Sequence, residues 1–266
     1  MHRWYFIFVQ WFKRDLEGRY RGSLLGLLWP LLQPLAQIAV FTLILHGFMQ
    51  VRWPAVTAAG NAGDPSSGAW TYALNVLAGL TVFNFFAEIL GRAPTAVLSQ
   101  PNLVTKVRFP LMLLPAVTVG AALVHVAVGA VVLMLAAAVS GSWSPHIAWL
   151  PLWLLPVVLY GTSLAFLLAS LGVYVRDIGQ AMPAVTGLLM FLTPIFYPMA
   201  AVPPSMRELF ALNPVAWAAE ALRGVLLDAR PLQLTDWAMH LAISFAAALV
   251  AAWVFRRLQN GFADVL

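Results

Sequence analysis

The sequence predicts an all-α integral membrane protein. We expect six transmembrane helices, an N-terminal amphipathic helix in the membrane interface, and short re-entrant helices between the fifth and sixth spans. Of the 266 residues, 62% are hydrophobic and only 9% are charged, whereas a soluble domain has about 45–50% and about 25%. The mean hydropathy is +0.84, and the apolar residues form long runs. These observations exclude an ordinary soluble enzyme and a disordered or fibrous protein.

The apolar runs define the spans, because a hydrocarbon core of about 30 Å requires roughly 20 helical residues. Runs of that length predict spans at residues 27–49, 71–90, 111–139, 150–173, 184–200 and 237–255. The fifth run is interrupted by Pro183, Pro194 and Pro198, which membrane helices tolerate when neighbours satisfy the freed carbonyls. The prediction is one transmembrane domain, 1–266, with its six-span bundle at 27–256 and both termini on one side.

The basic residues orient this topology. With the termini inside, the inner segments hold Arg3, Lys13, Arg14, Arg19, Arg21, Arg92, Lys106, Arg108, Arg176, Arg256 and Arg257, and the outer segments hold Arg52, Arg207, Arg223 and Arg230. This asymmetry follows the positive-inside rule. We therefore expect both termini on the cytoplasmic side of the membrane. The net charge of +5 then reflects membrane orientation, and no nucleic-acid partner is expected.

Residues 1–24 predict the interfacial helix. The stretch 4–12 is rich in Trp, Tyr, Phe and Ile but is too short to span, and six charged residues follow at 13–21. Such a segment lies in the interface with its aromatic rings at headgroup depth. An ordinary juxtamembrane anchor is the alternative. The first residues show no signal-peptide cleavage pattern.

The sequence contains no motif for catalysis or for nucleotide binding. GxxxxGK[ST] is absent, as is GxGxxG after a strand. If this protein moves a substrate uphill with ATP, a partner subunit would therefore have to hydrolyse the ATP. Cysteine is absent, which excludes disulfides, thiolate metal sites and a cysteine nucleophile. We expect no enzyme activity, no metal and no cofactor in this chain.

Five motifs resemble those of type-2 ABC exporter permeases, in the branch that exports O-antigen, capsule and teichoic acid. Residues 13–29 and 33–35 resemble the signature R-D-x-x-x-R-Y-x-x-S-x-L-G-x-x-W…P-L. The others follow in the family's order: 102–110 resembles N-L-x-x-K-x-x-F-P, 175–178 resembles F-R-D-I/V, 192–198 resembles L-T-P-I-x-Y-P, and 212–214 resembles L-N-P. Together they span most of the chain.

The resemblance implies a homodimer with two ABC ATPase subunits, which bind ATP and Mg. The two permease chains would enclose a channel for a lipid-linked polysaccharide. In such exporters the N-terminal interfacial helix acts as a gate helix. The loop between the second and third spans, here 91–110, carries a coupling helix that docks on the ATPase. Re-entrant helices in 201–236 would line the outer exit.

The gate helix contains candidate ligands for a lipid pyrophosphate, because Arg side chains bind phosphate bidentately at headgroup depth. These candidates are Lys13, Arg14, Arg19, Tyr20 and Arg21. Binding of ordinary anionic phospholipid, or a purely topological role, is the alternative. In the coupling loop we expect a short helix over about 95–104 that contacts the ATPase. The candidates there are Asn102, Leu103, Lys106 and Arg108; a simple polar turn is the alternative.

At the end of the second span, Glu88 and Arg92 have the i, i+4 spacing of a structural ion pair; a functional role for an ionisable group at membrane depth is the alternative. His125 is interpreted as a hydrogen-bonded packing residue, with a proton relay as the alternative. A sugar polymer requires a hydrated path with aromatic walls. The channel-lining candidates are Trp29, Gln33, Gln37, Tyr72, Phe83, Tyr160 and Tyr197. The two glutamines share one helix face and could equally hold helices together.

The outer segment 201–236 is interpreted as two short helices. Asn213 is expected to cap the second, with Pro214 at its first position, where a missing N–H costs nothing. The apolar run 215–227 is too short to span.

Three other functions are weighed against polysaccharide export. A type-2 permease for another cargo, a drug or another lipid, is the related alternative. A membrane enzyme acting on lipid-linked sugars is disfavoured, because the inner loops offer only Asp177 beside Arg176. A proton-coupled transporter would need carboxylates in mid-span.

Overall fold

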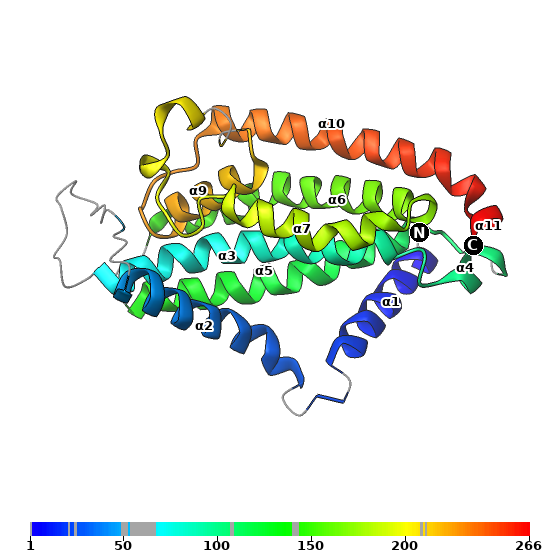
Figure 1. Ribbon diagram of the computed structural model, residues 1–266, viewed down its shortest axis with the longest axis horizontal. Helices are drawn as coiled ribbons and strands as arrows, with labels where there is room; N and C mark the ends of the chain where they lie inside the picture. Colours follow the sequence, from blue (N-terminus) through cyan, green and yellow to red (C-terminus); the bar gives the residue numbers. More distant parts are fainter. Residues whose placement is uncertain are drawn as a thin grey trace.

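The structure is a computed structural model that describes residues 2–20, 22–23, 26–48, 53, 68–106, 109–139, 144–207, 210 and 212–266. These residues form helices and turns without a strand, which confirms the all-α class (Figure 1). Four helical stretches are long and apolar enough to cross a membrane: Gly68–Thr95, Leu113–Val139, Pro145–Tyr174 and Leu234–Val265.

The α-helices are, in chain order, α1 (His2–Tyr20), α2 (Trp29–Phe41), α3 (Gly68–Arg92), α4 (Pro101–Thr105), α5 (Leu113–Val139), α6 (Leu150–Tyr174), α7 (Asp177–Phe191), α9 (Pro214–Leu226), α10 (Leu234–Leu258) and α11 (Phe262–Val265). The shorter elements are η1 (Gly26–Leu28), η2 (Thr42–Phe48, a π-helix), η4 (Ala93–Thr95), η5 (Pro145–Trp149), η6 (Met199–Ala201), η7 (Pro204–Met206) and η8 (Gln259–Gly261).

Helix α3 is the centre of the bundle. Every residue from Tyr72 to Phe83 is buried, and 83% of its most apolar window is enclosed, compared with 22% for that of α10. A helix that is apolar on all faces must be surrounded by other helices. Helices α5, α6 and α9 surround α3 here, with Leu77 and Phe85 in the shared core. The long exposed face of α10 is left for lipid or for another chain.

Four predicted spans coincide with helices that are long and apolar enough to cross a membrane, and the other two differ from the prediction. The first, 27–49, corresponds to α2 followed by the π-helical η2. The fifth was predicted at 184–200, but α7 starts at Asp177 and ends at Phe191. Its predicted bounds are wrong because proline prevents a helix from continuing and restricts the residue before it. Pro194 therefore ends this helix, whereas Pro183 is accommodated inside it.

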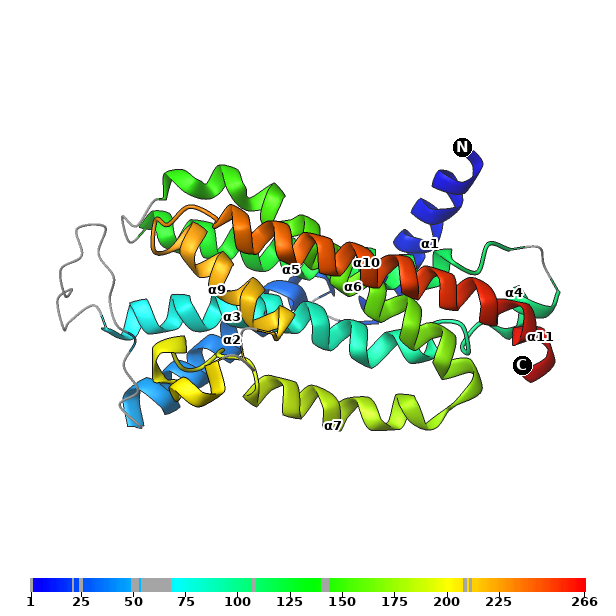
Figure 2. The same cartoon turned by 90° about the horizontal axis from the view of Figure 1, so that it is seen from above.

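The predicted N-terminal helix is confirmed as α1, which lies at a steep angle to the long axis of the bundle (Figures 1 and 2). It packs on α5, where Gly120 lets two aromatic rings approach: a Cβ there would lie 3.3 Å from Phe8 and 3.4 Å from Phe12. Trp11 packs edge-on against Phe109, with 5.5 Å between the two ring centroids. Both chain termini and α4 lie at the same end of the bundle.

Close packing fixes the segment that leads from α3 to α4. Gly172 of α6 lies against the backbone of Pro94 in η4, so closely that a Cβ would collide with the Pro94 carbonyl. Small residues allow this approach between membrane helices. At the same end, Tyr174 donates a hydrogen bond to the Leu258 carbonyl at 2.8 Å. The end of the bundle that carries α4 is therefore anchored on α6 and α10.

Candidate functional site

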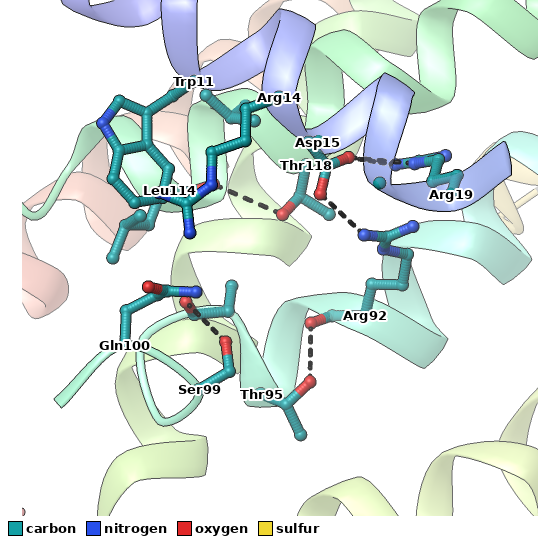
Figure 3. A pocket seen from close by; sticks show the side chains of 13 residues that line it. Trp11, Arg14, Asp15, Arg19, Arg92, Thr95, Ser99, Gln100, Leu114 and Thr118 are labelled. Carbon is teal, nitrogen blue, oxygen red and sulfur yellow. Dashed lines mark hydrogen bonds and ion pairs between the residues drawn. The ribbon is translucent and has the colours of Figure 1, made fainter. Parts of the chain in front are cut away.

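Five ionisable side chains from three helices meet where α1 crosses the bundle. Asp15 bridges two arginines: Arg19 Nε donates to its Oδ2 at 2.9 Å, and Arg92 Nη2 donates to its Oδ1 at 2.7 Å (Figure 3). Arg19 also donates through Nη1 to Glu88. The other Glu88 oxygen lies 2.7 Å from His125 Nδ1. We call these five residues the charged network.

Burial separates the charged network from an ordinary surface ion pair. The side chains of Arg19 and Glu88 are only 9% and 14% exposed. By contrast, Lys13 and Glu17, a pair on the same helix, are 70% and 67% exposed. A buried charge that loses its partner costs several kcal/mol, so each buried member holds the others in place. The charged network therefore ties α1 to α3 and α5.

The predicted ion pair between Glu88 and Arg92 is wrong. Arg92 turns to Asp15 on α1, and Glu88 pairs with Arg19 and His125. An i, i+4 pair on one helix contributes only about 0.2–0.5 kcal/mol, so partners on a second packed helix readily replace it. Residue spacing within one helix could not reveal them. His125 is a hydrogen-bonded residue as expected, with a carboxylate from another helix as its partner.

Two cavities flank the charged network, and both are lined by Arg19 and Arg92. The first has a volume of about 470 Å³ and lies between α1, α5 and the segment after α3. Its lining residues are Trp11, Arg14, Asp15, Gly18, Arg19, Arg92, Thr95, Ala96, Ser99, Gln100, Leu114, Val117 and Thr118. The second, of about 360 Å³, is lined by Arg19, Gln33, Pro34, Thr81, Asn84, Ala87, Glu88, Arg92, His125 and Gly129. We call the first the lower cavity and the second the upper cavity.

The structure separates the predicted gate-helix residues. Arg14 and Arg19 line the lower cavity, and the Arg14 guanidinium lies over the Trp11 ring, 4.6 Å from its centroid. Lys13 is exposed and pairs with Glu17 at 3.8 Å. Arg21 lies outside the described residues, as does the side chain of Tyr20.

The predicted coupling helix is shorter than expected. A helix over 95–104 was predicted, but α4 comprises only Pro101–Thr105. Proline has no N–H and fits the first turn of a helix rather than its interior, so Pro101 starts the helix. Asn102 and Lys106 are exposed, and Leu103 packs against a core cluster formed with α6 and α10. Arg108 lies outside the described residues.

The channel-lining candidates divide into exposed and enclosed side chains. Trp29 is exposed and donates to Ser23 Oγ at 2.7 Å. Gln33 lines the upper cavity, and Gln37 accepts a hydrogen bond from Asn84 at 3.3 Å. The glutamines therefore lie on the side of α2 that faces α3.

The remaining candidates are held by hydrogen bonds or burial within the chain. Tyr72 and Phe83 are 0% and 6% exposed, so neither lines a channel in this conformation, and the prediction is wrong for both. Tyr160 is hydrogen-bonded to His240 at 3.0 Å. Tyr197 donates to the Phe191 carbonyl at 2.7 Å.

Arg223 is a buried charged residue that the sequence analysis did not single out. This fully buried side chain of α9 donates to three backbone carbonyls: those of Asn75 at 3.1 Å, Pro194 at 2.7 Å and Ile195 at 3.0 Å. It also pairs with Glu220 at 2.6 Å. Burial lowers the pKa of the guanidinium, and Glu220 opposes that shift. One arginine inside an apolar run was the available signal.

Arg223 thus ties α3, α9 and the turn after α7 together, and local capping supports the same region. The Asn213 side chain accepts a hydrogen bond from the Val215 N–H at 2.9 Å, which confirms the predicted cap of α9. Its amide also donates to the Leu192 carbonyl at 3.0 Å. Of the two helices predicted in 201–236, the first is reduced in the described residues to the short turns η6 and η7.

Comparison with known proteins identifies the family. Residues 8–227 match the family described as ABC-2 type transporter. The O-antigen export system permease protein RfbA of Myxococcus xanthus is 26% identical over 260 residues, which cover 95% of this chain and 92% of that protein. Two proteins of the same name from Klebsiella pneumoniae are 23% and 21% identical, with the same coverage. This chain therefore belongs to the ABC-2 type transporter family of multi-pass membrane proteins.

Proposed function

We propose that this chain is the permease subunit of an ATP-driven transporter that exports a lipid-linked cell-surface polysaccharide across the cytoplasmic membrane. The observation that carries the proposal is the similarity to permeases named for O-antigen export, which extends over 95% of the chain. The charged network and its cavities are consistent with this cargo. They provide guanidinium groups for an anionic headgroup and amide groups, from Gln33 and Asn84, for sugar hydroxyls.

In this proposal α1 is the gate helix on the inner membrane surface. Arg14 and Arg19 would meet the lipid pyrophosphate from the inner leaflet, because guanidinium groups bind phosphate bidentately. Arg92 joins them from α3, since it lines the same cavity. Lys13 is placed for contact with phospholipid headgroups instead, as its side chain is 70% exposed.

The α4 segment is the proposed ATPase-docking element. It offers the exposed side chains of Asn102 and Lys106, while half-buried Leu103 holds it against the bundle. The segment η4, which precedes it, is packed against α6 through Gly172. A force applied at α4 would therefore be transmitted to α3 and α6.

The proposal includes six membrane crossings and a dimer. Helix α2 with η2, and helix α7, would complete the set formed by the four long apolar helices, and they run alongside those helices in Figure 1. Both termini lie at the end of the bundle that carries α4, so docking of a cytoplasmic ATPase there would make both termini cytoplasmic. A second copy of the chain would cover exposed apolar faces and complete the channel.

Co-purification with the ATPase subunit tests the proposal. The permease should retain an ABC ATPase in detergent, and Lys106→Glu should weaken that association while leaving the unfolding of the permease unchanged. Lys13→Glu makes the same charge change at an exposed position away from α4 and should retain the ATPase. Failure of the native chain to bind any ATPase subunit would overturn the proposed function.

A further inference from the structure

Asp15 occupies a position suited to a phosphate group. Its two carboxylate oxygens accept hydrogen bonds from guanidinium groups on different helices, Arg19 of α1 and Arg92 of α3. Figure 3 shows both guanidiniums directed at this one carboxylate, at the wall of the lower cavity. Two guanidiniums converging on one anion is the arrangement by which proteins bind phosphates and carboxylates alike.

The Asp15 carboxylate has fewer acceptor oxygens than Arg19 and Arg92 have N–H donors. A guanidinium has five N–H groups. Arg19 Nε and Nη2 lie 2.9 Å and 2.8 Å from the same Asp15 oxygen, Oδ2, so two donors share one acceptor. Arg92 remains 41% exposed. An anion with more acceptor oxygens than a carboxylate would satisfy these donors better.

The lower cavity is cationic apart from Asp15. Among the described residues, three arginines line it, with Arg14 beside the pair already described, and Asp15 is the one acidic residue. Thr95, Ser99 and Gln100 add neutral hydrogen-bonding groups. A volume of about 470 Å³ leaves space for a ligand beside the carboxylate.

We propose that Asp15 is a built-in competitor for a diphosphate-binding site formed by Arg19 and Arg92, and that a bound diphosphate displaces it. This inference rests on the proposed function and adds a regulatory step. With the site empty, Asp15 ties α1 to α3. When a diphosphate takes both arginines, the pair between Asp15 and Arg92 is broken, while Arg19 still pairs with Glu88 of α3. Arg92 is the last residue of α3, and its carbonyl accepts a hydrogen bond from Thr95 in η4, so the change starts next to the segment that leads to α4.

The test compares two substitutions on one helix that remove the same charge. Asp15→Asn frees the arginines, and Glu17→Gln is its control at an exposed position four residues from Lys13. The permease–ATPase complex is reconstituted into nanodiscs, and its ATPase rate is measured against added polyprenyl diphosphate. Free pyrophosphate and phosphatidylglycerol serve as separate probes, which distinguish a lipid-borne diphosphate from a soluble one and from ordinary anionic lipid.

Asp15→Asn should lower the half-saturating polyprenyl diphosphate concentration roughly tenfold, the equivalent of one charge-assisted hydrogen bond. Glu17→Gln should leave it unchanged. Arg92→Gln should raise the half-saturating concentration. In the Arg92→Gln background, adding Asp15→Asn should not lower it. An unchanged or raised half-saturating concentration for Asp15→Asn overturns the inference, as does an equal gain in Glu17→Gln or a response to phosphatidylglycerol alone.

Two results separate this inference from the proposed function. If the native complex hydrolyses ATP and responds to polyprenyl diphosphate but Asp15→Asn has no effect, only the inference fails. If the native chain binds no ATPase, the proposed function fails. Should Asp15→Asn not assemble, Asp15→Glu keeps the competing charge on a longer side chain. The half-saturating concentration of Asp15→Glu must then stay within about threefold of the native value. A tenfold decrease in that concentration would contradict the inference.

Discussion

The molecule has two buried arginine sites at opposite ends of α3, and they are built in different ways. The side chains of Asp15 and Glu88 hold Arg19. Two cavities that are lined in part by polar side chains lie beside it. Arg223 is held mainly by three backbone carbonyls and is 1% exposed. Both residues are charged and enclosed. Arg19 depends on side-chain carboxylates, whereas Arg223 has one side-chain partner, Glu220, beside its three backbone carbonyls.

This difference suggests different roles. A side-chain carboxylate can be replaced by another anion without unfolding a helix, whereas a backbone carbonyl cannot leave its helix end. Arg19 is therefore suited to a site that changes during transport, and Arg223 is suited to fixing the end of the bundle opposite α4. The predictions below test that contrast through the free energy of unfolding in detergent micelles.

Removal of the Arg223 guanidinium should have the largest effect. Arg223→Met would leave the carbonyls of Asn75, Pro194 and Ile195 without their donor, and we expect a loss of about 3–5 kcal/mol. Arg207→Met is the control, because Arg207 also donates to two carbonyls of the outer segment but is exposed. A control loss as large as that of Arg223→Met would contradict the role assigned to burial.

Crowding the same arginine should have the next largest effect. A Cβ at Gly79 would lie 2.7 Å from Arg223 Nη2 and 3.1 Å from the Ile195 Cα, so Gly79→Ala should cost about 1–3 kcal/mol. Gly91→Ala, on the same helix with no atom within 4 Å, should be neutral or stabilising, because alanine favours helix. Equal losses at the two positions would show that packing around Arg223 is not tight.

The two glutamates that pair with the buried arginines give the sharpest comparison. Glu88→Gln should cost about 1–2 kcal/mol, because Arg19 and His125 both lose an anionic partner. It should also make trypsin cleave within α1 sooner. Glu220→Gln should cost under about 1 kcal/mol, since Arg223 keeps its three carbonyls. A larger loss for Glu220→Gln would reverse our assignment of side-chain and backbone support.

The smallest effect is expected at the exposed pair on α1. Lys13 and Glu17 are 3.8 Å apart and mostly exposed, and such pairs contribute about 0–1 kcal/mol. Lys13→Ala should change the free energy of unfolding by less than about 0.5 kcal/mol. A loss comparable to that of Glu88→Gln would mean that burial does not distinguish the charged network.

Much of the fold could be predicted from composition and periodicity, because length and apolarity determine which segments can cross a membrane. Helices α3, α5, α6 and α10, the N-terminal helix α1 and the Asn213 cap all depend on neighbours along the chain. The bounds of α7 and α4 were predicted less well. In both helices a proline lies within or next to the apolar run. Whether that proline falls in the first turn or in the interior decides where the helix begins and ends.

The partners in the site could not be predicted in the same way. Sequence spacing pairs Glu88 with Arg92, yet packing of α1 on the bundle brings Asp15 and Arg19 to them and turns both side chains aside. His125 gains its carboxylate from a residue 37 positions away. Arg223 binds carbonyls up to 148 positions distant. Contacts of this kind depend on helix arrangement, which residue types alone do not specify.

The central claim is that the charged network at α1 responds to a diphosphate while the outer arginine site stays fixed, and a pair of distances tests it most directly. The chain has no cysteine, so Lys13→Cys with Gly91→Cys can be spin-labelled specifically on α1 and α3. Trp70→Cys with Leu212→Cys, both exposed, is the outer control. Adding polyprenyl diphosphate to the ATPase complex should shift the α1–α3 distance and leave the outer distance unchanged. An unchanged α1–α3 distance, at concentrations that stimulate ATP hydrolysis, would contradict the account.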